Sequence, residues 1–326
     1  RMCREWADRF VNVQREGFKR LGVNADWDHP YLTFQPDYES ANVEVFKRMY
    51  LDGAVYRGRK PIHWCSHCHT ALAEAEIEYA DEVSPSIYVN FKLNNVPAIF
   101  ARAGVDVERA FVLIWTTTPW TLPANTAVSL GPDIDYCFVE ADGIFMLLAH
   151  EMVESIAEVA GWNNWRVVSA QGEPVLLKGN KFEGITYQTP ILHQVEGRII
   201  WGDHVTLEAG TGLVHTAPGY GDDDYQVGKK YGLPIFAPMN DQGVLTAENG
   251  PEFDGVFYQD ADDISLDLLK QHHALLKQEP LEHSYPFDWR TKKPIVFRAT
   301  DQWFVSIDKM RDEILNAVDE VKYYPS

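Results

Sequence analysis

Cysteine is scarce in this chain of 326 residues, with only four occurrences, at positions 3, 65, 68 and 137. Four cysteines are too few for a disulfide-built scaffold, and the count fits a reducing compartment. Cys65 and Cys68 form a single C-x-x-C pair, and no second pair follows it. Because a zinc ribbon needs two such pairs, the sequence argues against a four-cysteine zinc site as well as against a disulfide-rich fold.

Long apolar runs are also missing. The run Phe111–Trp115 is among the longest, far below the roughly 18 residues that a membrane-spanning helix needs. No charged-then-apolar leader opens the chain. We therefore expect a cytoplasmic protein that does not enter a membrane. The first residue is Arg rather than Met, which indicates a fragment of a longer protein.

Several catalytic signatures are absent. The chain has no G-x-x-x-x-G-K-[ST] phosphate loop, no G-x-S-x-G nucleophile elbow and no H-E-x-x-H zinc motif. A serine or cysteine nucleophile is therefore not indicated.

Positively charged residues are also few, since the chain has 29 Lys and Arg against 48 Asp and Glu, for a net charge of −19. A protein held to nucleic acid by many phosphate contacts is usually basic, so any such contact here should be local.

The hydrophobic pattern divides the chain into helical ends and a strand-rich middle. Helical periodicity marks the first segment and a second one from Tyr38 to about Leu51, and it returns after about Asp262. Between them, short runs such as 87–93 and 111–115 have the composition and spacing of strands and are separated by turn residues. Helices are expected within this middle at 150–160 and 224–231. Many short strands favour a barrel or sandwich, so we predict a β-rich domain inserted into another domain.

A threonine-rich stretch, WTTTPWTLPAN, occupies positions 115–125. A strand is expected to end in Thr116, Thr117 and Thr118. Two prolines should then prevent a helix and leave a fixed, extended loop crowded with hydroxyls. Such a loop offers donors and acceptors to a ribose and a purine edge. The alternative is a β-branched strand that continues into an ordinary turn.

A second stretch, GTGLVHTAPGYGDDDY, occupies positions 210–225. Its glycines predict unusual backbone geometry and close approach of a ligand. His215 follows an apolar strand, and three aspartates open a helix after the loop. Taken singly, the histidine reads as a core or surface group and the aspartates as helix caps. Together they place a titratable ring, a flexible loop and carboxylates within ten positions, which favours a functional site.

These stretches resemble motifs of the isoleucyl-tRNA synthetases, a family of class I aminoacyl-tRNA synthetases. The threonine stretch is similar to the first motif of their editing domain, and the His-to-Asp stretch to the second. Positions 61–79 and 283–308 resemble the junctions that join this domain to the catalytic core, and 20–33 resembles the core just upstream. Valyl and leucyl relatives usually place Arg where Thr118 stands, which favours the isoleucyl family.

The resemblance implies an α+β chain in four parts. A β-barrel-rich editing domain would occupy 84–274, inserted into an α/β catalytic core whose flanking segments lie at 1–52 and 275–326. A junction containing the C-x-x-C pair would occupy 53–83. HIGH-type and KMSKS-type motifs are absent, so this fragment should neither activate amino acids nor charge tRNA.

The resemblance also implies what individual residues do. Three residues would hold the terminal adenosine of the tRNA and the scissile ester, and three more would form further walls of the pocket: Thr116, Thr117 and Thr118, then Trp120, Thr121 and Asn125. Asp224 would pair with the α-ammonium group of the attached amino acid. His215 would close the side-chain pocket and exclude isoleucine by size.

The implied activity is hydrolysis of valine wrongly attached to isoleucine tRNA. One methylene is worth only ~1–3 kcal/mol in a binding pocket, a limit for which isoleucyl-tRNA synthetases are the standard example. A second, hydrolytic site therefore rejects the larger isoleucine. A positioned water would cleave the ester, and either His215 or the ribose hydroxyl could serve as base.

The implied partners are the terminal adenosine of tRNA(Ile) carrying valine and the remainder of the parent synthetase, with the chain itself monomeric. Editing needs no cofactor. At the later junction some family members carry a second cysteine pair, where this chain has Asp288 and Thr291. We therefore expect Cys65 and Cys68 to be metal-free, with a weak zinc site completed by His or Asp as the alternative.

Two other functions stay open. The chain could be a tRNA-end-binding module that is inactive when isolated, or a zinc-ribbon interaction protein.

Overall fold

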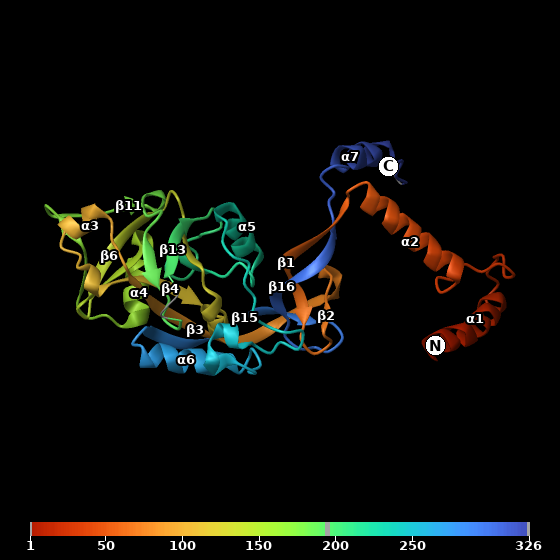
Figure 1. Cartoon of the computed structure of the whole chain (residues 1–326), viewed down its shortest axis with the longest axis horizontal. Helices are drawn as coiled ribbons and strands as arrows, with labels where there is room; N and C mark the ends of the chain where they lie inside the picture. The colour runs from red at the N-terminus through yellow and green to blue at the C-terminus, as the bar shows by residue number, and fades with distance from the viewer. Residues whose placement is uncertain (1, 193–195, 325–326) are drawn as a thin grey trace. The chain divides into compact units, whose positions relative to one another are not determined.

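The structure, a computed structural model, describes residues 2–192 and 196–324 (Figure 1). The chain divides into two compact units, one formed by Arg1–Gly58 with Gln302–Ser326 and the other by Arg59–Asp301. The borders expected at 83/84 and 274/275 both lie inside the second unit. They stay predictions, because compactness alone does not show where one domain is inserted into another.

The first unit is mainly helical. Two helices, α1 (Met2–Arg20) and α2 (Pro36–Leu51), confirm those expected at the start of the chain, and α7 (Arg311–Glu320) lies near its end. Pro36 occupies the first turn of α2, where its missing N–H removes no helical hydrogen bond. None of the described side chains of these helices is buried. This unit therefore has little core of its own.

An eleven-stranded sheet forms the body of the second unit. Its strands are β3 (Ile77–Leu93), β4 (Ala110–Thr116), β5 (Ala127–Leu130), β6 (Asp135–Ala141), β7 (Ile144–Ala149), β8 (Trp165–Val167), β11 (Leu177–Lys178), β12 (Thr186–Gln188), β13 (Glu196–Trp201), β14 (Leu213–Thr216) and β15 (Leu275–Asp288). The main order is β11-β6-β7-β4-β14-β5-β13-β12-β3-β15, with β8 beside β6. Because β3 also pairs with β4, the pairings that run from β4 through β14, β5, β13 and β12 return to β3.

The structure thus mixes helices and strands, and it confirms the strand-rich middle of the chain. Two smaller pairings complete the strand inventory. The strands β1 (Val55–Cys65), β2 (Thr70–Ala71) and β16 (Val296–Val305) form a three-stranded sheet in the order β16-β1-β2. The strands β9 (Ser169–Ala170) and β10 (Glu173–Pro174) form a short antiparallel pair.

Aromatic side chains fill the core of the second unit. Phe100, Phe138 and Phe182 are fully buried, and the rings of Phe100 and Phe138 lie 4.9 Å apart. Tyr136 is buried with them, and its hydroxyl accepts from the Gly131 N–H at 2.8 Å and donates to the Gly212 carbonyl at 2.7 Å. This satisfied phenol ties β6 to the glycine segment that precedes β14.

The helices of the second unit are short. The expected helix at 150–160 is confirmed as a 3₁₀ turn, η4 (His150–Met152), followed by α4 (Val153–Ala160). The expected helix at 224–231 is confirmed as α5 (Asp222–Tyr231), which starts two residues earlier. The other α-helices described in this unit are α3 (Ala98–Arg102) and α6 (Ala261–Gln271). Among the described residues, no helix combines the length and apolar character needed to cross a membrane.

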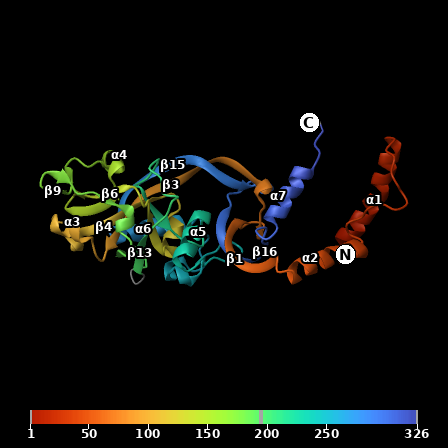
Figure 2. The same cartoon turned by 90° about the horizontal axis from the view of Figure 1, so that it is seen from above.

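The expectation that helix resumes after about Asp262 is confirmed by α6 and α7 but is wrong for the residues between them. Residues 275–288 form β15, which pairs antiparallel with β3 from Leu275↔Val89 to Asp288↔Ile77, and 296–305 form β16. Figures 1 and 2 show β3 and β15 side by side along their length. Much of β15 is polar and half-exposed, so it lacks the clean alternation that marks a strand in the sequence. Its partner strand, nearly 200 residues away, decides its structure.

Candidate hydrolytic site

A cavity of about 360 Å³ lies beside the ends of two parallel strands, β4 and β14. Because these strands are parallel neighbours, the segments that follow them emerge at the same edge of the sheet. The threonine stretch follows β4, and the loop leading to Asp224 follows β14. The residues that line the cavity are Trp115, Thr116, Thr117, Thr118, Thr121, His204, Thr206, Glu208, Ala209, Gly210, Thr211, Gly212, Leu213, Val214, His215, Ala217, Tyr220 and Asp224.

The threonine stretch is compact rather than extended, which corrects the prediction made from its prolines. After Thr116 ends β4, residues Pro119–Ala124 form a 3₁₀ helix, η3. Pro119 takes the first position, where no N–H is needed, and the N–H groups of Thr121 and Asn125 still bond to the carbonyls of Thr118 and Leu122. Proline therefore starts this short helix instead of preventing it.

Hydroxyl groups within the threonine stretch hold one another in place. Thr116 Oγ1 accepts the Thr118 N–H at 3.1 Å and lies 3.3 Å from Thr118 Oγ1. Thr121 Oγ1 donates to the Thr118 carbonyl at 2.8 Å. Thr117 has no such hydrogen bond among those found in the described part of the chain. The stretch thus presents preorganised hydroxyls to the cavity without needing substrate to order them.

His215 lies in β14 and is held at both ring nitrogens. Asn125 Nδ2 lies 2.7 Å from Nδ1 and also donates to the Ala127 carbonyl at 2.9 Å, while Asn125 Oδ1 accepts from the Tyr187 hydroxyl at 2.6 Å. These contacts fix the orientation of the Asn125 amide, so Nδ1 of His215 is an acceptor. Nε2, 3.0 Å from Thr121 Oγ1, is then the donor, because the Thr121 hydrogen goes to Thr118.

The electrostatics of His215 favour a neutral ring. Burial lowers the pKa of His215 to about 4, since its surroundings disfavour a charge. With one nitrogen accepting from Asn125 and the other donating to Thr121, the ring has no free base at neutral pH. The geometry therefore makes His215 a rigid wall of the cavity rather than a proton acceptor.

Asp224 lies in the first turn of α5 and reaches back toward the loop. Its Oδ2 accepts the Ala217 N–H at 2.8 Å, just after β14. Burial raises the pKa of Asp224 to about 6, and the charge of Asp223 adds to this rise, whereas the bond from Ala217 opposes it. The carboxylate is thus mainly ionised at neutral pH, partly desolvated and without a cationic partner among the interactions found in the described residues. Such a group attracts an ammonium ion.

Glycines allow the chain to pass close to its neighbours around the cavity. Gly212 has φ +74°, and a side-chain carbon there would lie 2.4 Å from Cβ of Ala149. A carbon added to Gly219 would lie 2.0 Å from the Phe236 carbonyl oxygen. The structure therefore confirms the unusual backbone geometry expected of these glycines, whereas the close approach of a ligand stays a prediction.

Two of the predicted site residues do not line this cavity. Asn125 is buried behind His215, and Trp120 lies on a second cavity of about 210 Å³ on the other side of the threonine stretch. The Trp120 ring packs edge-on against Tyr220, with centroids 4.9 Å apart, and against Tyr258 at 5.3 Å. Both residues therefore support the cavity wall from behind. The roles predicted for all eight residues remain predictions.

Other residues of the site were not singled out from the sequence. Tyr220 lines the cavity, and its hydroxyl has no hydrogen-bond partner among the described residues. His204 and Glu208 line it from the segment before the glycines. Tyr187 holds Asn125 from β12. Tyr220 belongs to the His-to-Asp stretch, so that motif indicates its proximity to the site. Nothing in the sequence around His204, Glu208 or Tyr187 indicates that they contact the site.

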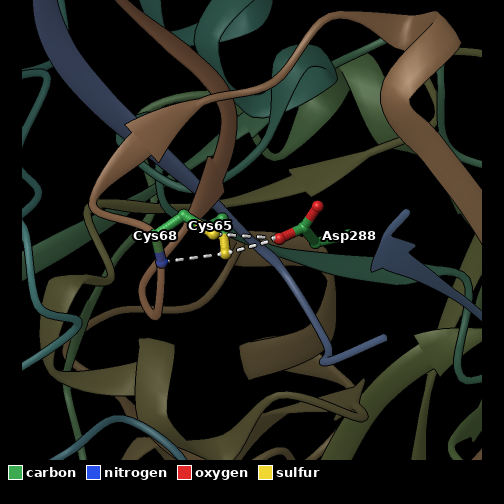
Figure 3. A group of neighbouring side chains, drawn as sticks. All are labelled: Cys65, Cys68 and Asp288. Atoms are coloured by element: carbon green, nitrogen blue, oxygen red, sulfur yellow. Dashed lines mark hydrogen bonds between the residues drawn. The ribbon is translucent and has the colours of Figure 1, made fainter. Parts of the chain in front are cut away.

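The C-x-x-C pair lies elsewhere in the second unit and meets Asp288 (Figure 3). Figure 3 shows both cysteine side chains directed at its carboxylate. The Sγ atom lies 3.0 Å from Oδ2 for Cys65 and 3.4 Å for Cys68. Thr291 Oγ1 donates to the same oxygen at 2.8 Å. Burial alone would raise the pKa of Asp288, but hydrogen bonds from Cys65, Thr291 and the Arg290 N–H lower it to about 2.

This cluster offers fewer ligands than a structural zinc ion takes. Among the residues that the structure describes, Cys65, Cys68 and Asp288 bring three donor atoms within 4.8 Å of one another. Structural zinc sites are closed by four Cys, His or carboxylate ligands, whereas the next contacting group here is the Thr291 hydroxyl. The donor set therefore does not fit a structural zinc site. In place of a metal ion, hydrogen bonds from Cys65, Cys68 and Thr291 to Asp288 Oδ2 connect the end of β1 to the end of β15.

Comparison with known proteins places the chain in a family. A family model described as "tRNA synthetases class I (I, L, M and V)" matches residues 1–326. Isoleucine–tRNA ligases are among the similar curated proteins: that of Limosilactobacillus fermentum is 53% identical over 100% of this chain, and that of Geobacillus kaustophilus is 46% identical over 99%. These matches cover 34% and 33% of the relatives, so the chain spans about a third of their length.

A solved structure described as "The crystal structure of GlLeuRS-CP1" overlaps with 62% of this chain and 99% of its own, with a TM-score of 0.46 and 17% identity. So weak an overlap establishes no shared fold. The family match and the isoleucine–tRNA ligase relatives confirm the resemblance seen in the motifs. The chain therefore belongs to the class I tRNA synthetases of the I, L, M and V group, and it is similar throughout its length to a segment of isoleucine–tRNA ligases.

Proposed function

We propose that this chain is the editing region of an isoleucine–tRNA ligase and hydrolyses valine from misacylated tRNA(Ile). One observation carries the proposal: the threonine stretch, His215 and Asp224 border one cavity, although Thr116 and Asp224 are 108 positions apart. The cavity joins hydroxyl groups suited to a ribose, a carboxylate suited to an ammonium group and a neutral ring suited to an apolar side chain. A valyl ester of adenosine carries all three complementary groups. The sheet around it, whose pairings return to β3, is proposed to be the barrel of the editing domain.

In the proposed mechanism, the enzyme positions a reactive ester rather than attacking it. Asp224 binds the α-ammonium group, and Thr116, Thr117 and Thr118 bind the ribose and the ester. An aminoacyl ester is already activated, so orientation of water and stabilisation of the developing oxyanion supply the rate. Because His215 is neutral and held at both nitrogens, we assign proton transfer to the ribose hydroxyl next to the ester. Water attacks the ester carbonyl and the acyl C–O bond breaks; the hydroxyl takes a proton from the water as it passes its own proton to the departing ribose oxygen.

Selection by size follows from the rigidity of His215. The ring is clamped between Asn125 and Thr121, so it cannot swing away from a larger side chain. The extra methylene of isoleucine would then overpack the pocket, at a typical penalty of ~1–3 kcal/mol. Valine fits, and isoleucine correctly attached to the same tRNA is spared.

The test is release of valine from valyl-tRNA(Ile) by this chain. We expect catalysed release, and we expect Asp224→Ala to remove most of it because the ammonium group loses its partner. Asp223→Ala, a neighbouring exposed carboxylate on the same helix turn, is the matched control and should stay active. Binding of a non-hydrolysable valyl-adenosine analogue without any turnover would contradict the proposal and favour an inactive tRNA-end-binding module.

A further inference from the structure

A carboxylate outside the proposed site holds the threonine stretch from behind. Asp262 Oδ1 accepts the Trp120 N–H at 3.0 Å, across 142 positions of sequence. Pro119 has no N–H, so Trp120 supplies the first backbone donor of η3. A carboxylate at the start of a helix also interacts favourably with its dipole. Asp262, from the first turn of α6, therefore caps the short helix into which the threonines lead.

The threonine stretch has open space on both faces. Thr117 and Thr118 line the larger cavity on one side and the 210 Å³ cavity on the other. Asp262 and Trp120 also border the smaller cavity. Residues Pro119–Ala124 are buried, whereas Thr117 and Thr118 are half-buried between the two spaces and depend more on the anchoring of the helix that follows them. Its anchors toward the smaller cavity are the bond from Trp120 to Asp262 and the contact of the Trp120 ring with Tyr258.

The groups around Asp262 are acidic or neutral. Glu82 from β3, Tyr258 from the preceding loop and Tyr285 from β15 border the same small cavity, and Asp263 follows it on α6. No basic residue is among the residues that line this cavity. The Trp120 N–H is thus the principal group that favours the ionised form. Burial raises the pKa of Asp262 to about 7, and the charge of Asp263 adds to the rise, while the Trp120 bond opposes it.

We propose that Asp262 is a positioning residue for the hydrolytic reaction, which holds Thr117 and Thr118 at the cavity through the backbone of Trp120. The expected effect on the rate of hydrolysis rests on the proposed function. The anchoring of the threonine stretch by Asp262 does not depend on that function. The ionised carboxylate makes a charge-assisted bond, roughly twice as strong as a neutral one. The threonines should therefore be held best when Asp262 is ionised.

The experiment compares Asp262→Asn with Asp263→Asn in this chain. Both variants remove one negative charge from the same helix turn, but only the first weakens the cap. For Asp262→Asn we expect kcat for valyl-tRNA(Ile) to fall about tenfold with little change in KM, because a neutral bond replaces a charge-assisted one. The enzyme-catalysed rate of the wild type should rise through pH 7, and this inflection should be missing in Asp262→Asn but present in Asp263→Asn.

Amide hydrogen exchange provides a second readout that needs no activity. Exchange at Trp120 should be faster in Asp262→Asn and Asp262→Ala than in the wild type and Asp263→Asn. Unchanged exchange together with a wild-type pH profile would overturn the positioning role. If the wild type releases no valine while Trp120 exchange responds to Asp262, the anchoring stands and the proposed function fails, so the two failures are distinguishable.

Discussion

At the scale of single residues, the site depends on a histidine that works by staying uncharged. His215 has its usual pKa lowered to about 4 by burial, and its nitrogens are occupied by Asn125 and Thr121. Between pH 4 and 6.5 the unfolded chain binds a proton here that the folded chain does not. This group therefore makes the folded state more stable as pH rises through that window.

His215→Ala tests the size selection. Removing the ring opens room for the extra methylene of isoleucine, so the ratio of isoleucine to valine release should rise about tenfold or more. The ratio is measured because any loss of folded protein lowers both rates equally. His150→Ala, a change on η4 away from the cavity lining, is the control. An unchanged ratio in His215→Ala would remove this residue from the size filter.

Asp224 shows the opposite relation between charge and stability. Its folded pKa of about 6 lies above its ordinary value, so the folded chain holds the proton more tightly and loses stability as pH rises from about 4 to 6. Asp224→Asn removes this loss. We expect the variant to be more stable than the wild type at pH 8 by roughly 1–3 kcal/mol, with a smaller gain at pH 4, while losing activity. Urea unfolding at both pH values measures this. An equal gain at both would contradict the account.

Among helices and strands, local sequence patterns identify the two motifs but not the distant residues that hold them in place. The threonine stretch and the His-to-Asp stretch are visible in the sequence because Thr, Gly, Pro and Asp cluster there. Their meeting follows from the parallel pairing of β4 with β14, which periodicity does not reveal. Asp262 lies 142 positions from Trp120 and Tyr187 lies 62 from Asn125, so no local signal exists for either contact.

The Cys65, Cys68 and Asp288 cluster acts at the same scale, because it joins the end of β1 to the turn after β15. Asp288→Ala leaves two thiols and the Thr291 hydroxyl without their acceptor, and should destabilise the fold by ~2–4 kcal/mol. Asp254→Ala, an exposed position, should have little effect. Since the donor set is one ligand short for zinc, a chelator should leave Tm unchanged. One bound zinc per chain and a lower Tm after chelation would contradict this.

At the scale of the whole molecule, the two units differ in how complete they are. The second unit contains the aromatic core, the eleven-stranded sheet and both cavities. The helices of the first unit bury none of their described side chains. We therefore expect a fragment spanning 59–301 to fold cooperatively, with a Tm close to that of the full chain, and to retain valine release. A fragment without a cooperative thermal transition would show that the second unit depends on the first.

In the proposed function, one cavity both hydrolyses the ester and selects the amino acid by size. The decisive measurement is the rate at which this chain releases valine and isoleucine from the same tRNA(Ile). Since one methylene decides the outcome, we predict that kcat/KM for valine release exceeds that for isoleucine by about 10- to 200-fold. Equal release of the two amino acids, or faster release of isoleucine, would contradict the account.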